Sequence, residues 1–134
     1  MKKECTTRTK QKIVTFSEKR STLILKNTNQ IIATCVVVDG CEITSGVRCD
    51  HFMLANDVEH YIELKGQDLT HAIDQIISTI KALSINISKQ AKISYIICTR
   101  SPLNSTAIQN LQVQFRKNYN SRLIIKSSPY QTSF

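Results

Sequence analysis

Residues 48–66 read Arg-Cys-Asp-His-Phe-Met-Leu-Ala-Asn-Asp-Val-Glu-His-Tyr-Ile-Glu-Leu-Lys-Gly. The pattern predicts two strands, Arg48–Ala55 and Val58–Lys65, joined by a tight turn at Asn56-Asp57. A turn of two or four residues fixes the antiparallel register by counting, so that Asp50 faces Glu63. Directly paired residues place their side chains on the same sheet face, with Cβ atoms about 5 Å apart.

Lys65 lies two residues after Glu63 and therefore shares its face. Two carboxylates and an ammonium converge there, and such a group binds a divalent cation and activates water for phosphodiester cleavage. The alternative is an acidic pair on a sheet surface, with Lys65 as a structural counter-ion. Opposed like charges destabilise paired strands, and neighbouring carboxylates tend to share a proton, unless a cation offsets the repulsion.

The rest of the chain predicts an α/β fold with one mixed central sheet, an antiparallel meander and flanking helices, in a single domain over residues 1–134. We expect a helix of about five turns after an N-cap at Asp68. A second helix should start at residues 102–104 and carry Ile108, Leu111, Val113 and Phe115 on or near its buried side. The other expected strands are Thr22–Lys26, Ile31–Val38, Ile93–Cys98 and Arg122–Lys126.

Three further expectations concern the chain ends and the hairpin. Residues 1–12 are polar and predict a loose arm, and residues 127–134 predict an irregular tail. The second face of the hairpin is apolar and should be covered by helices; it carries Met53, Ala55, Val58, Ile62 and Leu64.

The charge is distributed unevenly along the chain, whose formal net charge is +8. Residues 1–26 hold eight Lys/Arg and two Glu, and residues 89–134 hold seven Lys/Arg and no acid. Residues 27–88 hold three Lys/Arg and eight Asp/Glu. A basic surface that neutralises phosphates around an acidic centre suits a metal-dependent nuclease, although basic ends that are simply solvated give the same pattern.

The five cysteines are irregularly spaced and predict free thiols in a reducing cytoplasm. Cys35, Cys41 and Cys49 near His51 suggest a zinc site, but no Cys-x-x-Cys pair supports one, and buried small side chains are the favoured interpretation. No apolar run approaches the ~20 residues of a membrane span, and no apolar segment follows the basic start.

The facing Asp50 and Glu63-Leu64-Lys65, followed by a helix, resemble the PD-(D/E)xK nuclease superfamily, which includes restriction endonucleases and archaeal Holliday-junction resolvases. The resemblance covers about Ile31 to Cys98. It implies a restriction-endonuclease-like core in which Asp50 and Glu63 ligate Mg²⁺ or Mn²⁺, with the Leu64 carbonyl as a third ligand. It also implies that Lys65 stabilises the attacking hydroxide or the developing charge.

The resemblance extends to a further acid and a glutamine. Many members add an acid from an N-terminal helix, for which Glu18 is the better placed candidate and Glu42 the weaker one. Gln75 matches a glutamine on the helix after Glu-x-Lys, and His71 lies one turn earlier on the same face; both residues could instead lie on a solvated helix edge. Asp39 before Gly40 is interpreted as a turn former rather than a ligand.

Basic residues near this centre are candidates for phosphate contacts. Arg48 pairs with Lys65 in the predicted register, and the further candidates are His71, Arg100, Arg116, Lys117 and Arg122. Each could equally be a solvated surface residue.

The predicted function is a magnesium-dependent DNA endonuclease, directed by nucleic-acid shape, by homodimerisation or by a partner protein. A catalytically inactive nucleic-acid-binding or regulatory protein on the same fold, and an RNA nuclease, are the alternatives.

Overall fold

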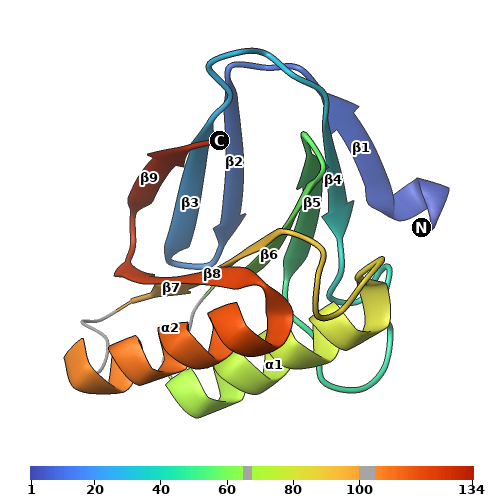
Figure 1. Ribbon diagram of the computed structural model, residues 1–134. Coiled ribbons are helices and arrows are strands. Elements are labelled where there is room, and N and C mark those ends of the chain that lie inside the picture. Colours follow the sequence, from blue (N-terminus) through green and yellow to red (C-terminus); the bar gives the residue numbers. More distant parts are fainter. Residues whose placement is uncertain (65–67, 100–104) are drawn as a thin grey trace.

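The computed structural model describes residues 1–64, 68–99 and 105–134 (Figure 1). A six-stranded mixed sheet has the order β1-β4-β5-β6-β7-β8. Its strands are β1 (Thr6–Thr9), β4 (Ala33–Val37), β5 (His51–Ala55), β6 (Val58–Leu64), β7 (Lys92–Cys98) and β8 (Ser121–Ser127). A smaller sheet has the order β2-β3-β9, with β2 (Ile13–Glu18), β3 (Ser21–Lys26) and β9 (Tyr130–Ser133). The helices are η1 (Lys3–Cys5), α1 (Leu69–Leu83) and α2 (Ser105–Tyr119).

The central hairpin has the predicted register along β5. Ala55 pairs with Val58, and the ladder continues to His51 opposite Ile62. The two turn residues, Asn56 and Asp57, both have positive φ, as a tight two-residue hairpin turn requires. The ladder does not extend to Asp50, whose backbone N–H donates to the Ile62 carbonyl. The ladder thus keeps the predicted register but stops one residue short of the predicted Asp50–Glu63 pair, because β5 begins at His51.

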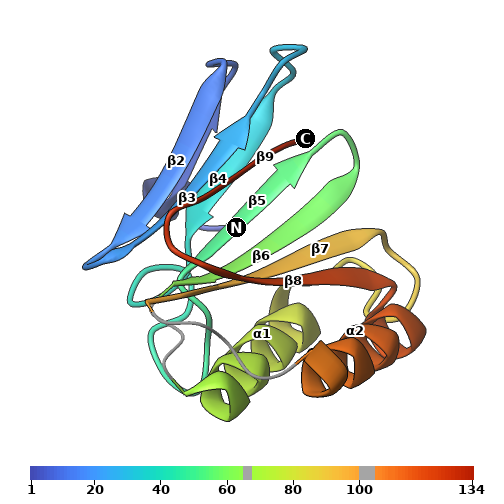
Figure 2. The ribbon, with the colours of Figure 1, turned by 90° about the vertical axis from the view of Figure 1, so that its left-hand side faces the viewer.

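The large sheet is covered differently on its two faces (Figure 2). Both α-helices lie on one face and contact β6, β7 and β8, with a core that includes Phe52, Tyr61 and Ile76. The other face is covered by the small sheet, whose Leu23 and Leu25 pack in one core with the hairpin residues Met53, Ala55, Ile62 and Leu64. The expectation of helices over that apolar face is wrong, since strands cover it.

Both ends of the chain are ordered strands rather than loose segments. Thr6–Thr9 pairs antiparallel with β4, and Tyr130–Ser133 pairs parallel with β3. The expectations of a loose arm and an irregular tail are therefore wrong. Alternation in Ile13–Glu18 buries Val14 and Phe16, which also makes the region of Glu18 a strand and not a helix.

The predicted helices are present in the described residues. α1 begins after Asp68, whose side chain accepts from the His71 N–H as an N-cap. α2 buries Phe115 but leaves Val113 66% exposed, because a residue two positions away points to nearly the opposite side of a helix. The predicted start at residues 102–104 lies outside the described residues.

The parallel strands of the large sheet determine where the candidate site lies. β6, β7 and β8 are parallel, so their carboxyl ends lie at one edge of the sheet. α1 follows β6 and begins near this edge, and residue 50 enters β5 beside it. Among the described residues, no helix is long and apolar enough to cross a membrane.

Candidate functional site

Asp50 and Glu63 lie together at the carboxyl end of β6. Both are buried, with 3% and 4% exposure. The Oδ2 of Asp50 accepts a 2.8 Å hydrogen bond from the N–H of Leu64, the amide that links Glu63 to Leu64. Alternation along β6 places Glu63 on the helix-covered face with Tyr61, whereas the Leu64 side chain packs toward the small sheet.

The buried thiol of Cys49 directly precedes Asp50 in the chain. Burial raises the pKa of this thiol to about 12, and the charges of Glu63 and Asp50 add to the effect. Its Sγ also donates to the His51 carbonyl. A raised pKa disfavours the thiolate, which is the form of cysteine that acts as a nucleophile.

Helix α1 holds the segment that leads into Asp50. The Oγ1 of Thr79 accepts from the Cys49 N–H at 2.8 Å and donates to the Gln75 carbonyl. The Nε2 of Gln75 donates to the Arg48 carbonyl at 3.0 Å. Two side chains of one helix thus fix the backbone just before the acid, which gives Gln75 a positioning role in this structure.

Arg48 does not belong to β5, contrary to the predicted strand start. Its Nε donates to Asp39 Oδ1 at 2.8 Å, and its Nη1 donates to the Gly46 carbonyl. Asp39 precedes Gly40, whose φ is +77°, so it is the expected turn residue and also the partner that orients this guanidinium. The side chain of Arg48 is anchored while part of its surface stays exposed.

A cavity of about 260 Å³ opens beside this segment. It is lined by Asp39, Gly46, Val47, Arg48, His71 and Gln75. The structure therefore brings together three predicted residues, Arg48, His71 and Gln75, next to the segment that ends at Asp50. A guanidinium and an imidazole at the start of a helix form a suitable place for an anion.

Glu18 does not join the carboxylates. It ends β2 in the small sheet, and its Oε1 lies 3.6 Å from His51 Nε2. The His51 ring packs against Phe16 of the small sheet, so it lies on the face opposite to Glu63. Burial lowers the pKa of His51, and the charges of Asp50, Glu18 and Asp39 act in the opposite direction.

Glu42, the weaker candidate, is also occupied elsewhere. Its Oε1 accepts from the backbone N–H of Lys2. Among the described residues, no group of three or more His, Cys, Asp or Glu side chains is arranged to hold a metal ion.

The remaining basic candidates are not gathered at this edge. Arg116 and Lys117 lie in the last turn of α2, close to Tyr119, whose carbonyl accepts from Lys92. Lys92 pairs in register with Glu59, at the other end of β6 and about 13 Å along the strand from Glu63. Arg122 is the second residue of β8 and lies near that same end. Lys65 and Arg100 lie outside the described residues.

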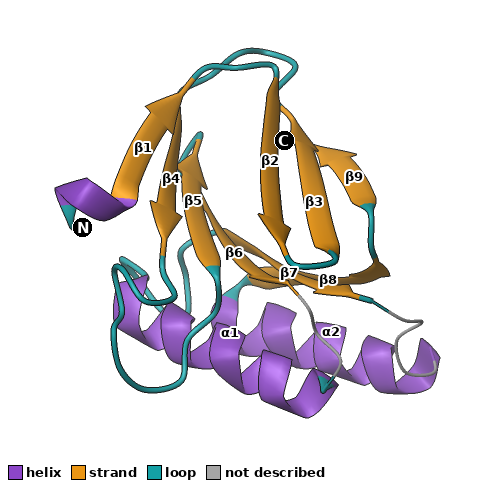
Figure 3. Cartoon of the chain, turned by 180° about the vertical axis from the view of Figure 1, so that it is seen from behind, coloured by secondary structure: helices purple, strands orange, loops and turns teal. Residues whose placement is uncertain are grey.

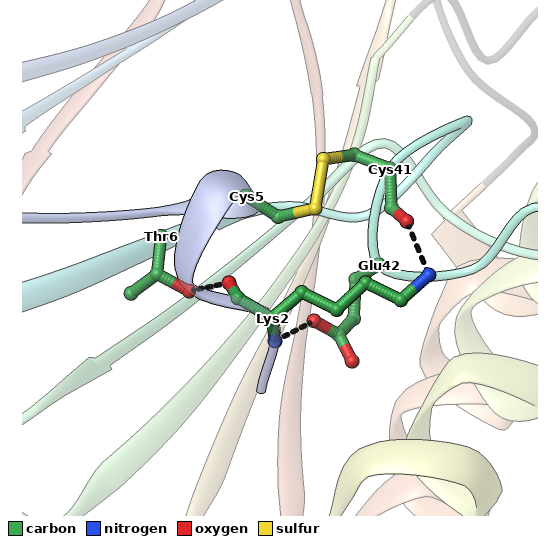
Figure 4. The surroundings of a disulfide bond; sticks show 5 residues. All are labelled: Lys2, Cys5, Thr6, Cys41 and Glu42. Atoms are coloured by element: carbon green, nitrogen blue, oxygen red, sulfur yellow. Dashed lines mark hydrogen bonds between the residues drawn. A yellow bond between two sulfur atoms is a disulfide. The ribbon is translucent and has the colours of Figure 1, made fainter.

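The cysteine prediction was wrong for two residues. Cys5 and Cys41 form a disulfide that joins η1 to the β4–β5 connection (Figure 4). The chain has five cysteines, an odd number, at irregular intervals, so the sequence did not indicate this pair. Its two members lie 36 residues apart in sequence. Cys35, Cys49 and Cys98 are free thiols, as expected, and the disulfide removes Cys41 from any zinc site.

Sequence reasoning missed the hydrogen bond between the Cys49 backbone N–H and the Thr79 hydroxyl. The helical spacing of Gln75 and Thr79, one turn apart on α1, is the signal that could have paired them with the hairpin. Comparison of the chain with protein-family models, curated proteins and solved structures found no match.

Proposed function

We propose that the chain is a magnesium-dependent DNA endonuclease of the PD-(D/E)xK kind, with a restriction-endonuclease-like core. One observation carries the proposal: two buried acidic residues, Asp50 and Glu63, lie at the carboxyl end of β6, where Asp50 accepts from the Leu64 N–H. The order of elements supports it, since an antiparallel meander of β4, β5 and β6 is followed by α1 and the parallel strand β7.

The donor set suits Mg²⁺ or Mn²⁺ better than a softer metal. Mg²⁺ is commonly bound through one or two carboxylates and substrate phosphates, and it keeps several water ligands. Asp50 and Glu63 would hold it, with the Leu64 carbonyl as the further ligand in the proposal. Zinc sites in proteins are usually built from Cys and His ligands, whereas Asp50 and Glu63 offer carboxylate oxygens.

The chain's own residues have separable roles in the proposed hydrolysis. The bound cation would lower the pKa of a water molecule and offset charge on the scissile phosphate. Water attacks phosphorus in line, the bond to the 3′ oxygen breaks, and the products carry a 5′-phosphate and a 3′-hydroxyl. Arg48, held by Asp39, would orient a phosphate beside the acids, and Lys65 would stabilise the developing negative charge.

The proposal also covers substrate and setting. We include recognition of DNA by its shape, by a homodimer or through a partner protein. We include a cytoplasmic location, where DNA is accessible; the Cys5–Cys41 disulfide is the observation that counts against it, because such bonds persist mainly in oxidising compartments.

The test compares cleavage of linear duplex, branched and single-stranded DNA, and of RNA, with Mg²⁺, with Mn²⁺ and with EDTA. We expect metal-dependent DNA cleavage that Glu63→Gln lowers by at least about a thousandfold, since this change removes a charge and keeps the side-chain shape. Glu42→Gln is the matched control: the Glu42 side chain accepts from the Lys2 backbone N–H, and the variant should keep full activity.

Calorimetry separates the alternatives. Metal titrated into the protein with a nonhydrolysable duplex should give an isotherm for the wild type and none for Glu63→Gln. Duplex binding without metal binding would contradict the nuclease proposal and leave a nucleic-acid-binding protein on the same fold. Cleavage of RNA alone would replace DNA as the substrate.

A further inference from the structure

The helix layer covers only part of its sheet face. α1 and α2 lie over β6, β7 and β8, as Figure 3 shows from behind, and α1 also shares a buried core with Val36 of β4. On the uncovered part, one cross-strand row runs from Arg8 through Thr34 and Leu54 to Glu59. These side chains share the helix-covered face of the sheet, so the row continues the surface on which α1 lies.

A groove of about 700 Å³ occupies this part of the face. The sheet forms its floor, and the end of α1 with the following residues forms a wall that includes Leu83 and Ile85. Three apolar lining residues are strongly exposed: Met1 by 58%, Leu54 by 40% and Ile85 by 82%. Exposed apolar side chains grouped in a concavity mark a site of interaction.

Among the described residues that line the groove, the charge exposed to a partner is positive. Lys3 and Arg8 line it and are exposed. Glu59 also lines it but is buried, and its two oxygens accept from the Tyr61 hydroxyl and the Ile85 N–H. The groove therefore offers an apolar floor with a positive rim.

We propose that this groove binds an amphipathic helix of a partner protein that carries acidic residues beside its apolar face. A helix laid over β5, β4 and β1 would occupy the next position in the layer formed by α1 and α2, and its acids would meet Lys3 and Arg8. A second copy of this chain fits less well. Its most exposed apolar helix residue, Val113, stands near Arg116 and Lys117, which would face the same positive rim.

The disulfide supports the groove by fixing one of its walls. Cys5 is joined to Cys41, and the Lys2 ammonium donates to the Cys41 carbonyl, so the segment that carries Met1 and Lys3 is tied to the β4–β5 connection (Figure 4). The groove is thus formed before a partner arrives, which lowers the entropic cost of binding.

The test uses two synthetic amphipathic helices of about 18 residues with the same leucine face, one flanked by Glu and one flanked by Lys. Fluorescence anisotropy with the full chain, in EDTA and without nucleic acid, measures both affinities. We expect the Glu-flanked peptide to bind about tenfold tighter or more, and Arg8→Glu to reverse this preference. Ile85→Glu should weaken binding of the Glu-flanked peptide about tenfold, while Val113→Glu, a matched change on exposed α2, should leave it unchanged.

Several results would overturn the proposal. Equal affinity for the two peptides, or no binding of the Glu-flanked peptide at millimolar concentration, would exclude an acidic helical partner. Self-association of the wild type that Ile85→Glu abolishes would assign the groove to a second copy. Ile85 is largely exposed, so its variant keeps the fold, and urea unfolding confirms this independently. The readout needs no cleavage, so failure of the nuclease proposal would leave this one standing.

Discussion

The Oδ2 atom of Asp50 lies 2.8 Å from the backbone nitrogen of Leu64 and accepts its hydrogen bond. The β5–β6 ladder ends at His51 opposite Ile62, so the carboxylate satisfies an amide that the strand does not reach. Asp50 therefore has a structural role besides the proposed metal-binding one. The two acids therefore need different experiments. For variants of Asp50, a loss of activity must be distinguished from a loss of stability.

Asp50→Ala should lower the free energy of unfolding by about 1–3 kcal/mol, since it leaves the buried Leu64 N–H without its acceptor. Asp50→Asn keeps a side-chain oxygen in nearly the same place and should cost less. Urea denaturation of the two variants measures the difference. Equal losses would show that the hydrogen bond contributes nothing to stability.

The local parts of the fold could be predicted from the sequence. The hairpin register follows from counting across Asn56-Asp57, and the N-cap at Asp68 with its apolar spacing predicts α1. These features depend on neighbours in sequence, where turn chemistry and periodicity act directly.

The failures concern contacts between segments far apart in sequence. Nothing local in Thr6–Thr9 or Tyr130–Ser133 indicates a strand, because each is short and only partly buried and becomes one by pairing with β4 or β3. The Cys5–Cys41 pair depends on the same placement. Glu18 was misplaced because its role was taken from the resemblance, whereas the alternation around it favours a strand.

Replacing both disulfide cysteines, Cys5→Ser with Cys41→Ser, should lower the free energy of unfolding by roughly 2–4 kcal/mol. The bond closes a loop across 36 residues, and its loss returns chain entropy to the unfolded state. Urea unfolding with and without a thiol reductant measures the effect. The reductant should destabilise the wild type and leave the double variant unchanged; an equal response of both proteins would contradict the prediction.

Lys92 is the main tie between the residues after α1 and the end of α2. Its Nζ lies 2.8–2.9 Å from the carbonyl oxygens of Asn86, Ile87, Gln90 and Tyr119, which share its three N–H donors. Lys92→Met keeps the stem but removes these bonds, so we expect a loss of about 2–4 kcal/mol. Hydrogen exchange should quicken over residues 84–91. Lys89→Met, at an exposed neighbour, should change neither quantity, and a similar effect from both would refute the special role of Lys92.

The buried His60 makes stability depend on pH. Its Nδ1 lies 2.8 Å from the Tyr95 hydroxyl, and burial lowers the pKa of the imidazole to about 4 from an ordinary value of 6.5. Between these values the unfolded chain binds a proton that the folded chain does not. Stability is therefore complete above pH 6.5 and falls by roughly 3 kcal/mol from this group as the pH drops to 4.

A double variant tests this dependence. His60→Leu with Tyr95→Phe removes both polar partners together, so neither is left buried without its bond. Urea unfolding from pH 7 to pH 4 should show a shallower loss than in the wild type, while carboxylate titration remains common to both. His71→Gln, at an exposed site on α1, should follow the wild-type curve. If the double variant also follows it, the proton uptake that weakens the fold in acid belongs to groups other than His60.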